Sequence, residues 1–165
     1  MTTVANPASA SGELVHASCV AIGTQAVLIT GPSGSGKSDL ALRLIDRGAT
    51  LVSDDYTQLH ADAASGTVIA SPPGTIAGRI EARGLGILTL PWRGRAPVAL
   101  VVALATGGEP PVERLPFEPG QWRLCGRDIP LVRLCGFEAS APIKLEYMMR
   151  ACAGSAPCPD TGIDP

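Results

Sequence analysis

Short apolar runs separated by turn residues fill the first part of the chain and predict a sheet of short strands. Residues 14–22 and 26–30 are rich in aliphatic and β-branched side chains, and Gly23-Thr24 between them is typical of a turn. We therefore expect the two strands to form a hairpin. Residues 39–47 instead repeat apolar side chains at helical spacing and stop at Gly48, so they predict an amphipathic helix whose apolar face packs on the sheet.

The rest of the chain continues with short strands and two further helices. Strands are predicted within 50–53, 56–60, 67–70, 84–90, 96–105, 121–124 and 129–134. The run at 96–105 is the most continuous apolar stretch, which is typical of a strand buried on both faces. A short helix is predicted over 75–82. The last helix, with Ser140 as its N-terminal cap, is expected to run to about Cys152.

Length and composition predict a single folded domain. The chain has 165 residues, of which 45% are hydrophobic, so it can bury a real core but is too short for two ordinary domains. We expect this domain to span residues 13–152. Residues 1–12 predict a disordered lead and residues 153–165 a flexible tail, because both ends are polar or rich in small residues, proline and glycine.

Charge and cysteine content exclude several classes of protein. The net charge of −2 argues against a nucleic-acid binder, since such domains usually carry a basic surplus. No apolar run reaches the length of a membrane span, and residues 1–12 lack the basic start and apolar centre of a secretory signal. The five cysteines show no paired metal-ligand spacing, and an odd number suits a reducing compartment. We therefore expect a cytoplasmic protein that binds neither membrane nor nucleic acid.

A glycine-rich segment lies directly between the strand at 26–30 and the helix at 39–47. Its residues spell a complete phosphate-binding loop: Gly31, Pro32, Ser33, Gly34, Ser35, Gly36, Lys37 and Ser38. Glycines let successive backbone N–H groups point at phosphate oxygens, and the helix N-terminus adds partial positive charge. We expect Lys37 to reach the β- and γ-phosphates and Ser38 to offer its hydroxyl to a bridging Mg²⁺. The segment therefore predicts nucleotide binding.

Two adjacent carboxylates, Asp54 and Asp55, close the strand that follows the loop helix. The later apolar strand ends without an acid, so this early pair is the candidate for metal and acid/base chemistry. In open α/β sheets the carboxyl ends of strands face the ligand crevice. Because side chains alternate along a strand, one carboxylate is expected to face the reaction centre while its neighbour turns towards metal or backbone. The competing interpretation is an ordinary acidic turn.

The stretch from Gly31 to Asp55 resembles the catalytic domain of the bacterial HPr kinase/phosphorylase family. Two flanking features agree: His16 ahead of the loop, and residues 81–87, Glu-Ala-Arg-Gly-Leu-Gly-Ile, which are similar to the family's Glu-x-Arg-Gly-x-Gly-Ile segment. The likeness is good over about residues 14–92 and faint beyond them. It implies an α/β phosphate-loop domain of the phosphoenolpyruvate carboxykinase type, with a mixed sheet flanked by a few helices.

The resemblance implies a protein serine kinase that uses ATP and Mg²⁺. By position, Lys37 and Ser38 are the expected phosphate and metal contacts, and Glu81 is expected to supply a second metal-associated carboxylate. The catalytic base is expected from the acidic pair. The family pattern favours Asp55, and Asp54 stays open as the alternative.

Three further residues have two interpretations each. His16 matches an active-site histidine of the family, where we expect it to bond to the acidic pair or to a phosphate, whereas an isolated histidine is more often structural. Arg83 and Arg79 are candidates for holding phosphate or phosphoserine oxygens through their planar donors, although each also fits an ordinary surface position. The place of Arg83 in the motif makes it the better candidate.

The implied partner is an HPr-like phosphocarrier, and the implied assembly is a hexamer. Full-length family members carry a separate N-terminal domain, whereas nothing ahead of His16 is expected to fold alone, so the chain resembles the short form of alphaproteobacteria. Their carrier belongs to a regulatory phosphotransfer system. The family's Pro-Gly-Arg-Asn-like stretch has no counterpart near residues 138–142. Lys144 is an imperfect substitute for its arginine, because an ammonium group is a point charge and lacks the forked donors of a guanidinium. This departure weighs against phosphorolysis of phosphoserine-HPr.

Two other functions remain open at this level. The first is a kinase of a free serine or another small-molecule hydroxyl. The second is a regulatory module that senses ATP without transferring a phosphoryl group. Both would keep the phosphate-binding loop, so the loop does not distinguish them from a protein kinase.

Overall fold

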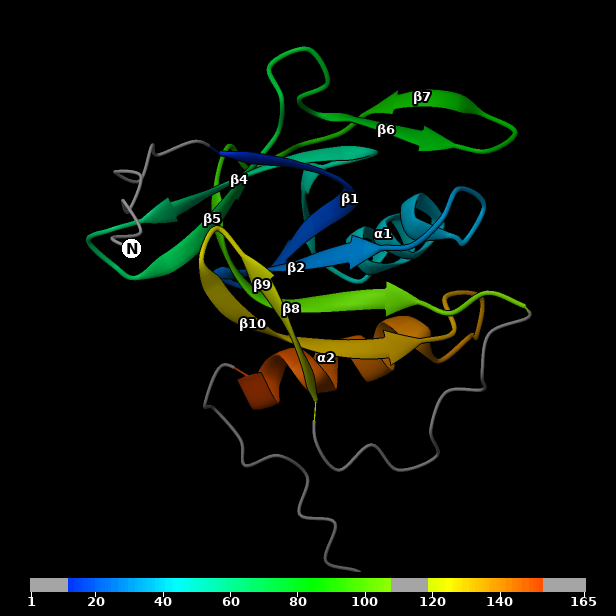
Figure 1. Ribbon diagram of the computed structural model, residues 1–165. Helices are drawn as coiled ribbons and strands as arrows, with labels where there is room; N and C mark the ends of the chain where they lie inside the picture. The colour runs from blue at the N-terminus through cyan, green and yellow to red at the C-terminus, as the bar shows by residue number, and fades with distance from the viewer. Residues whose placement is uncertain (1–11, 108–118, 153–165) are drawn as a thin grey trace, which may run out of the picture.

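The computed structural model describes residues 12–107 and 119–152, so the predicted lead and tail lie almost entirely outside the described residues. Within these residues, an eight-stranded mixed sheet and a separate two-stranded hairpin are combined with two helices (Figure 1). The α/β class expected from the sequence is confirmed.

The chain begins with the predicted hairpin. Strands β1 (Glu13–Ile22) and β2 (Gln25–Thr30) pair antiparallel around a turn at Gly23, whose φ of +65° suits glycine. The phosphate-binding loop follows β2 directly, and helix α1 (Lys37–Asp46) follows the loop. Strand, loop and helix therefore occur in the predicted order.

Five strands of the large sheet close on themselves. The remaining strands of this sheet are β3 (Thr50–Ser53), β4 (Tyr56–Asp62), β5 (Thr67–Ser71), β8 (Ala96–Leu104), β9 (Gly120–Leu124) and β10 (Arg127–Leu134). Strand β1 pairs with β4 through its first half and with β2 and β3 through its second half. Since β4 pairs with β5, β5 with β8 and β8 with β2, the pairings form a ring, from which β10 and β9 extend.

Alternating side chains give the central strands two hydrophobic cores. In β2, Val27 and Ile29 join the core that also holds buried residues of both helices, whereas Ala26 and Leu28 join a second core inside the ring of strands. Strand β8 contributes to both cores in the same way, so the predicted burial on both faces is confirmed.

Both helices pack on the first core. Helix α1 buries Leu40, Ala41 and Leu44, and α2 (Ala141–Cys152) buries Leu145 and Met149 in the same cluster. Helix α1 ends as predicted, with Gly48 at φ +107° and two backbone bonds closing the last turn. Neither described helix has the length and apolar composition needed to cross a membrane.

The helix predicted over residues 75–82 is wrong. Turns occupy the first part of this segment, and residues Arg79–Ala82 form strand β6, which pairs antiparallel with β7 (Gly86–Thr89). Ile80 and Ala82 are buried while Arg79 and Glu81 are exposed, so the segment follows the two-residue period of a strand. Eight residues were too few for their helical pattern to be distinguished from this alternation.

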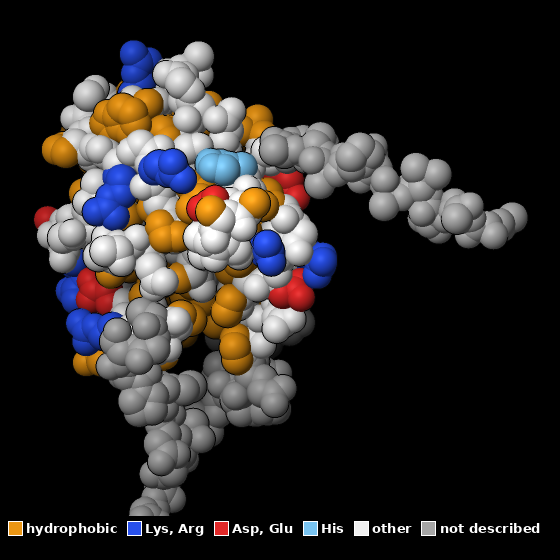
Figure 2. All heavy atoms as spheres, turned by 90° about the vertical axis from the view of Figure 1, so that its left-hand side faces the viewer, with side chains coloured by type: hydrophobic (Ala, Val, Ile, Leu, Met, Phe, Trp, Pro, Cys, Tyr) orange, Lys and Arg blue, Asp and Glu red, His pale blue; other side chains and the backbone are white. Residues whose placement is uncertain are grey.

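The topology gathers several loops at one end of the sheet. Strands β2, β8 and β10 are parallel, so the phosphate-binding loop after β2 and the loop after β10 emerge at the same end. The turn of the β6–β7 hairpin lies at this end too (Figure 1). On the face shown in Figure 2, which includes the opposite, β4–β5 end, basic and acidic side chains are interspersed and form no continuous basic surface.

A two-bond ion pair joins the C-terminal end of α1 to α2 and should contribute to stability. Arg47 donates from Nε and Nη2 to the two carboxylate oxygens of Glu146, at 2.8 Å each. These bonds hold the pKa of Glu146 below its usual value of 4.5. Glu146→Gln should lower the free energy of unfolding by about 0.5–1.5 kcal/mol at pH 7, because the pair is bidentate but partly exposed.

Denaturant unfolding at several pH values tests this prediction. A lowered pKa in the folded state gives stability that is present above pH 4.5 and is lost as the pH falls through the folded-state pKa, so wild type and variant should converge in acid. Asp128→Asn, which removes the single-bond surface pair with Arg123, is the control and should cost less than about 0.5 kcal/mol. Equal stability of wild type and Glu146→Gln at pH 7 would contradict the prediction.

Candidate active site

The phosphate-binding loop has a conformation that depends on glycine. Gly31 has φ +151°, and a Cβ atom at this position would lie 2.5 Å from the Ser35 Oγ. The loop is closed internally by a bond from the Ser35 N–H to the Pro32 carbonyl, 3.1 Å long, and Gly36 accepts the first backbone bond of α1 from Leu40. The loop is therefore held in a compact conformation by its own backbone.

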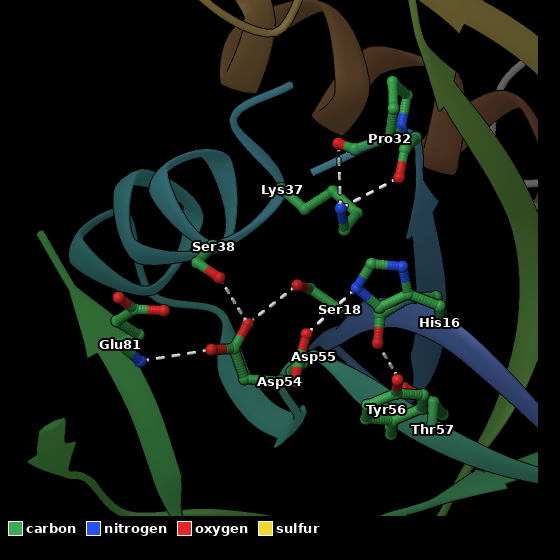
Figure 3. A network of polar contacts seen from close by, with 12 residues as sticks. His16, Ser18, Pro32, Lys37, Ser38, Asp54, Asp55, Tyr56, Thr57 and Glu81 are labelled. Atoms are coloured by element: carbon green, nitrogen blue, oxygen red, sulfur yellow. Dashed lines mark hydrogen bonds and ion pairs between the residues drawn. The ribbon is translucent and has the colours of Figure 1, made fainter. Parts of the chain in front are cut away.

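Lys37 lies folded against this loop. Its side chain is 7% exposed, and Nζ donates to the carbonyl oxygens of Gly31 at 2.8 Å and Pro32 at 3.1 Å. Burial lowers the pKa of Lys37, and the nearby charges of Asp55 and Asp54 partly oppose this shift. The ammonium group therefore sits beside the loop that was predicted to hold phosphate (Figure 3).

Asp54 is a buried hub of hydrogen bonds. Its Oδ1 accepts from the hydroxyls of Ser18 and Ser38, at 2.7 Å each, and its Oδ2 accepts from the backbone N–H of Glu81 at 3.1 Å (Figure 3). Asp54 is 5% exposed. Because buried carboxylates are costly unless their oxygens are satisfied, these donors from β1, α1 and β6 hold the group in place.

The Asp55 side chain points away from that of Asp54 because the backbone reverses at Asp55. It has φ +66°, and the N–H of Tyr56 donates to the carbonyl of Asp54 across it at 2.7 Å. A non-glycine residue with positive φ is uncommon and often marks a functional site. The exposed carboxylate of Asp55 is 2.9 Å from Nε2 of His16, whose ring also lies beside that of Tyr56.

One cavity of about 390 Å³ joins most of the predicted site residues. The predicted residues that line it are His16, Ser33, Gly34, Gly36, Lys37, Ser38, Asp55, Glu81 and Arg83. Asp54 and Ser35 are buried and do not line it, Gly31 and Pro32 line a neighbouring hollow, and Arg79 lines neither. Lys144, the weak substitute for the missing arginine, is instead paired with Glu138. The structure therefore separates the acidic pair into a buried member and a member that faces the cavity.

The oxygen groups around Ser38 fit a magnesium ion. Among residues 12–107 and 119–152, no three His, Cys, Asp or Glu side chains cluster as a self-sufficient metal site. Magnesium does not need such a cluster, because it usually binds one or two carboxylates together with substrate phosphates and water. The Ser38 hydroxyl and the Asp54 carboxylate already meet here, and Glu81 lies beside them (Figure 3). These groups would hold Mg²⁺ next to the phosphate loop.

Ser18 was not predicted as a site residue. This residue is fully buried, yet its hydroxyl lies in a strand whose neighbours Ala17 and Cys19 belong to the apolar core. Ser18 follows His16 by two positions, so both side chains lie on the same face of β1. One bonds to Asp54 and the other to Asp55. In the sequence, the available signal was a polar serine inside an otherwise apolar strand, two positions after a candidate site histidine.

Removal of the Ser18 hydroxyl should destabilise the protein. Ser18→Ala deprives the buried Asp54 carboxylate of a donor, which should lower the free energy of unfolding by about 1.5–3 kcal/mol. Urea denaturation measures this change. Ser71→Ala, at a half-buried serine of β5, is the matched control and should have a much smaller effect. A Ser18→Ala variant as stable as wild type would show that Asp54 does not depend on this bond.

Known proteins share this architecture. Residues 8–138 match the HPr serine kinase C-terminal domain. An HPr kinase/phosphorylase of Chlorobaculum tepidum is 33% identical over 156 residues, covering 86% of this chain and 46% of that protein. One of Stenotrophomonas maltophilia (strain K279a) is 34% identical over 135 residues, covering 73% of this chain and 42% of that protein. This chain thus spans less than half the length of these relatives.

A solved structure gives the same result at the level of the fold. The HPr(Ser) kinase/phosphatase from Coxiella burnetii has a TM-score of 0.75 and 27% sequence identity to this chain, and the match covers 87% of this chain and 92% of that one. The family match covers most of the chain, including β1, the phosphate loop, the acidic pair and the β6–β7 hairpin. This chain belongs to the HPr serine kinase C-terminal domain family.

Proposed function

We propose that this chain is an ATP- and Mg²⁺-dependent kinase that phosphorylates a serine of an HPr-like phosphocarrier. The observation that carries the proposal is the shared cavity in which the Asp55 carboxylate, held by His16, faces the lysine and hydroxyl of the phosphate loop. Family membership supports the same reaction class. A fold of the phosphoenolpyruvate carboxykinase type is part of this proposal.

The loop residues bind and orient the nucleotide. Backbone N–H groups of the loop hold phosphate oxygens, and Lys37 exchanges its bonds to the Gly31 and Pro32 carbonyls for the β- and γ-phosphates. Ser38, with Asp54 and Glu81 nearby, would hold a magnesium ion, which would supply positive charge to offset that of the nucleotide's phosphates. Arg83 lines the same cavity and steadies phosphate oxygens with its planar donors.

Asp55 acts as the base for the incoming serine. As the serine oxygen bonds to the γ-phosphorus, the bond from that phosphorus to the bridging oxygen of ADP breaks, and the serine proton passes to the Asp55 carboxylate. The exposed Asp55 carboxylate lines the cavity and is therefore accessible to a serine on another protein, whereas Asp54 is buried and already accepts three hydrogen bonds. His16 fixes the orientation of Asp55.

Partner, location and assembly complete the proposal. HPr is the substrate that the names of the relatives indicate, and a cytoplasmic hexamer is the state that the family resemblance implies. No arginine occurs around residues 138–142, where the resemblance would place the arginine-containing stretch tied to dephosphorylation. We therefore propose the forward, phosphorylating reaction as the main activity.

Asp55→Asn should abolish turnover while nucleotide binding persists. Asparagine keeps the volume of the side chain and tolerates positive φ, so the turn at this position is preserved. Loss of a general base should lower kcat by about 100-fold or more. The measurement is transfer of label from γ-labelled ATP to purified HPr with Mg²⁺, alongside ATP binding by calorimetry. Asp46→Asn, an exposed acid on α1, is the matched control.

Three outcomes would contradict parts of the proposal. Unlabelled HPr despite normal ATP binding would remove the protein-kinase function and leave an ATP-sensing module. Labelled free serine or another small hydroxyl compound in the absence of carrier would indicate a small-molecule kinase. Full turnover by Asp55→Asn would show that the base is another residue.

A further inference from the structure

An exposed aromatic ring covers the start of α1. Phe137 follows β10 and is 70% exposed, although it is a large apolar side chain. Its ring atoms Cε1 and Cζ lie 2.9 Å from the position that a Cβ atom on Gly36 would occupy, so the ring contacts the bare backbone of the phosphate loop. Phe137 also lines the active-site cavity. Nothing in the proposed phosphoryl transfer uses this ring.

The backbone that carries Phe137 is fixed on both sides. Arg43 of α1 donates to the carbonyl oxygens of Gly136 and Glu138, the latter at 3.1 Å. A Cβ atom on Gly136 would lie 2.9 Å from the Leu104 side chain and 3.1 Å from the Ser35 carbonyl, so this residue packs closely on the sheet and the loop. The ring is therefore presented on a held segment, which limits the entropy lost when a ligand binds to it.

Sheet order places Phe137 on the opposite flank of the phosphate loop from the acidic pair. Strands β1 and β3, which carry His16 and lead to Asp55, lie on one side of β2. Strands β8 and β10 lie on the other side, and Phe137 follows β10. A nucleotide whose γ-phosphate faces Asp55 can therefore extend towards Phe137 within the cavity that both residues line. Leu42 and Leu85 add apolar surface to the same cavity.

We propose that Phe137 is the stacking surface for the base of the nucleotide. This inference rests on the proposed function and assigns a contact to the base, which is the part of the ligand that the phosphate loop does not bind. Aromatic stacking is tolerant of base identity because every base has a π-face. A site whose base contact is one aromatic face and aliphatic side chains discriminates little between purines, so ATP and GTP should bind with similar affinity.

A second aromatic residue provides a direct alternative. Trp122 lines a separate hollow of about 590 Å³ together with Val15, His16 and Pro32. This hollow is also lined by Ala103 and Leu104 and contains neither Lys37 nor Ser38, so a base stacked on Trp122 would lie outside the cavity that holds the phosphate-binding side chains. Phe137 instead lines the same cavity as Lys37 and Ser38.

Binding measurements with and without a base test the inference. Dissociation constants of Mg²⁺-ATP, Mg²⁺-GTP and inorganic tripolyphosphate are measured by calorimetry for the full chain and its variants. Phe137→Ala should weaken both nucleotides about 5- to 20-fold and change tripolyphosphate by less than about twofold. Phe137→Leu, which still covers Gly36, should lose most of the same affinity, whereas Phe137→Trp should retain it. Trp122→Ala is the control and should bind all three ligands as wild type does.

Other results would overturn the inference. An equal loss for all three ligands in Phe137→Ala would assign the ring a role in packing the loop only. Unchanged nucleotide affinity in Phe137→Ala, or a selective loss in Trp122→Ala, would place the base elsewhere and leave the proposed kinase intact. Failure of the wild-type chain to bind either nucleotide would remove the kinase and this inference together.

Discussion

The candidate site depends on a buried carboxylate that is satisfied by donors from three separate elements. Asp54 accepts hydrogen bonds from Ser18 on β1, Ser38 on α1 and the Glu81 N–H on β6. An unsatisfied carboxylate at this depth would be strongly unfavourable. The Asp54 carboxylate therefore fixes the positions of three elements relative to one another. They are the helix that follows the phosphate loop, the strand that carries His16 and the hairpin that carries Arg83.

The sheet supplies a rigid frame for this carboxylate. Strand β1 is long enough to pair with β4 through one half and with β2 and β3 through the other, so it crosses beneath the site as a single element. His16 and Ser18 lie on one face of it, two residues apart. Side chains on a paired strand are held more accurately than side chains on a loop, which suits the two residues that bond to the Asp54 and Asp55 carboxylates.

Local sequence patterns predicted the elements whose signals are local. The β1–β2 hairpin, the helix after the loop and the doubly buried strand β8 all had strong periodicity or turn chemistry, and the loop itself lay between a strand and a helix. Segment 75–82 was misassigned because a short run gives few repeats of either period. The pairing of β1 with β3 and β4 joins residues far apart in the chain, which periodicity does not encode.

Side-chain alternation predicted that the two carboxylates of the acidic pair point different ways, but alternation alone did not assign the buried position to Asp54. This assignment follows from the positive φ of Asp55, which turns one carboxylate towards His16 and leaves the other beneath the loop. Composition and spacing treat the two residues alike. Only the donors gathered from distant strands distinguish them.

The folded-back position of Lys37 has a consequence for ligand selection. Its ammonium group already satisfies two carbonyl oxygens of the loop, so an arriving anion has to displace an internal partner before it gains this cation. The net binding free energy is the difference between the bonds gained with the ligand and the bonds lost within the loop. This difference is small for a ligand with one phosphate and grows with each further phosphate that the loop can hold. Under the proposed function, this internal competition would favour polyphosphates over ligands with a single phosphate.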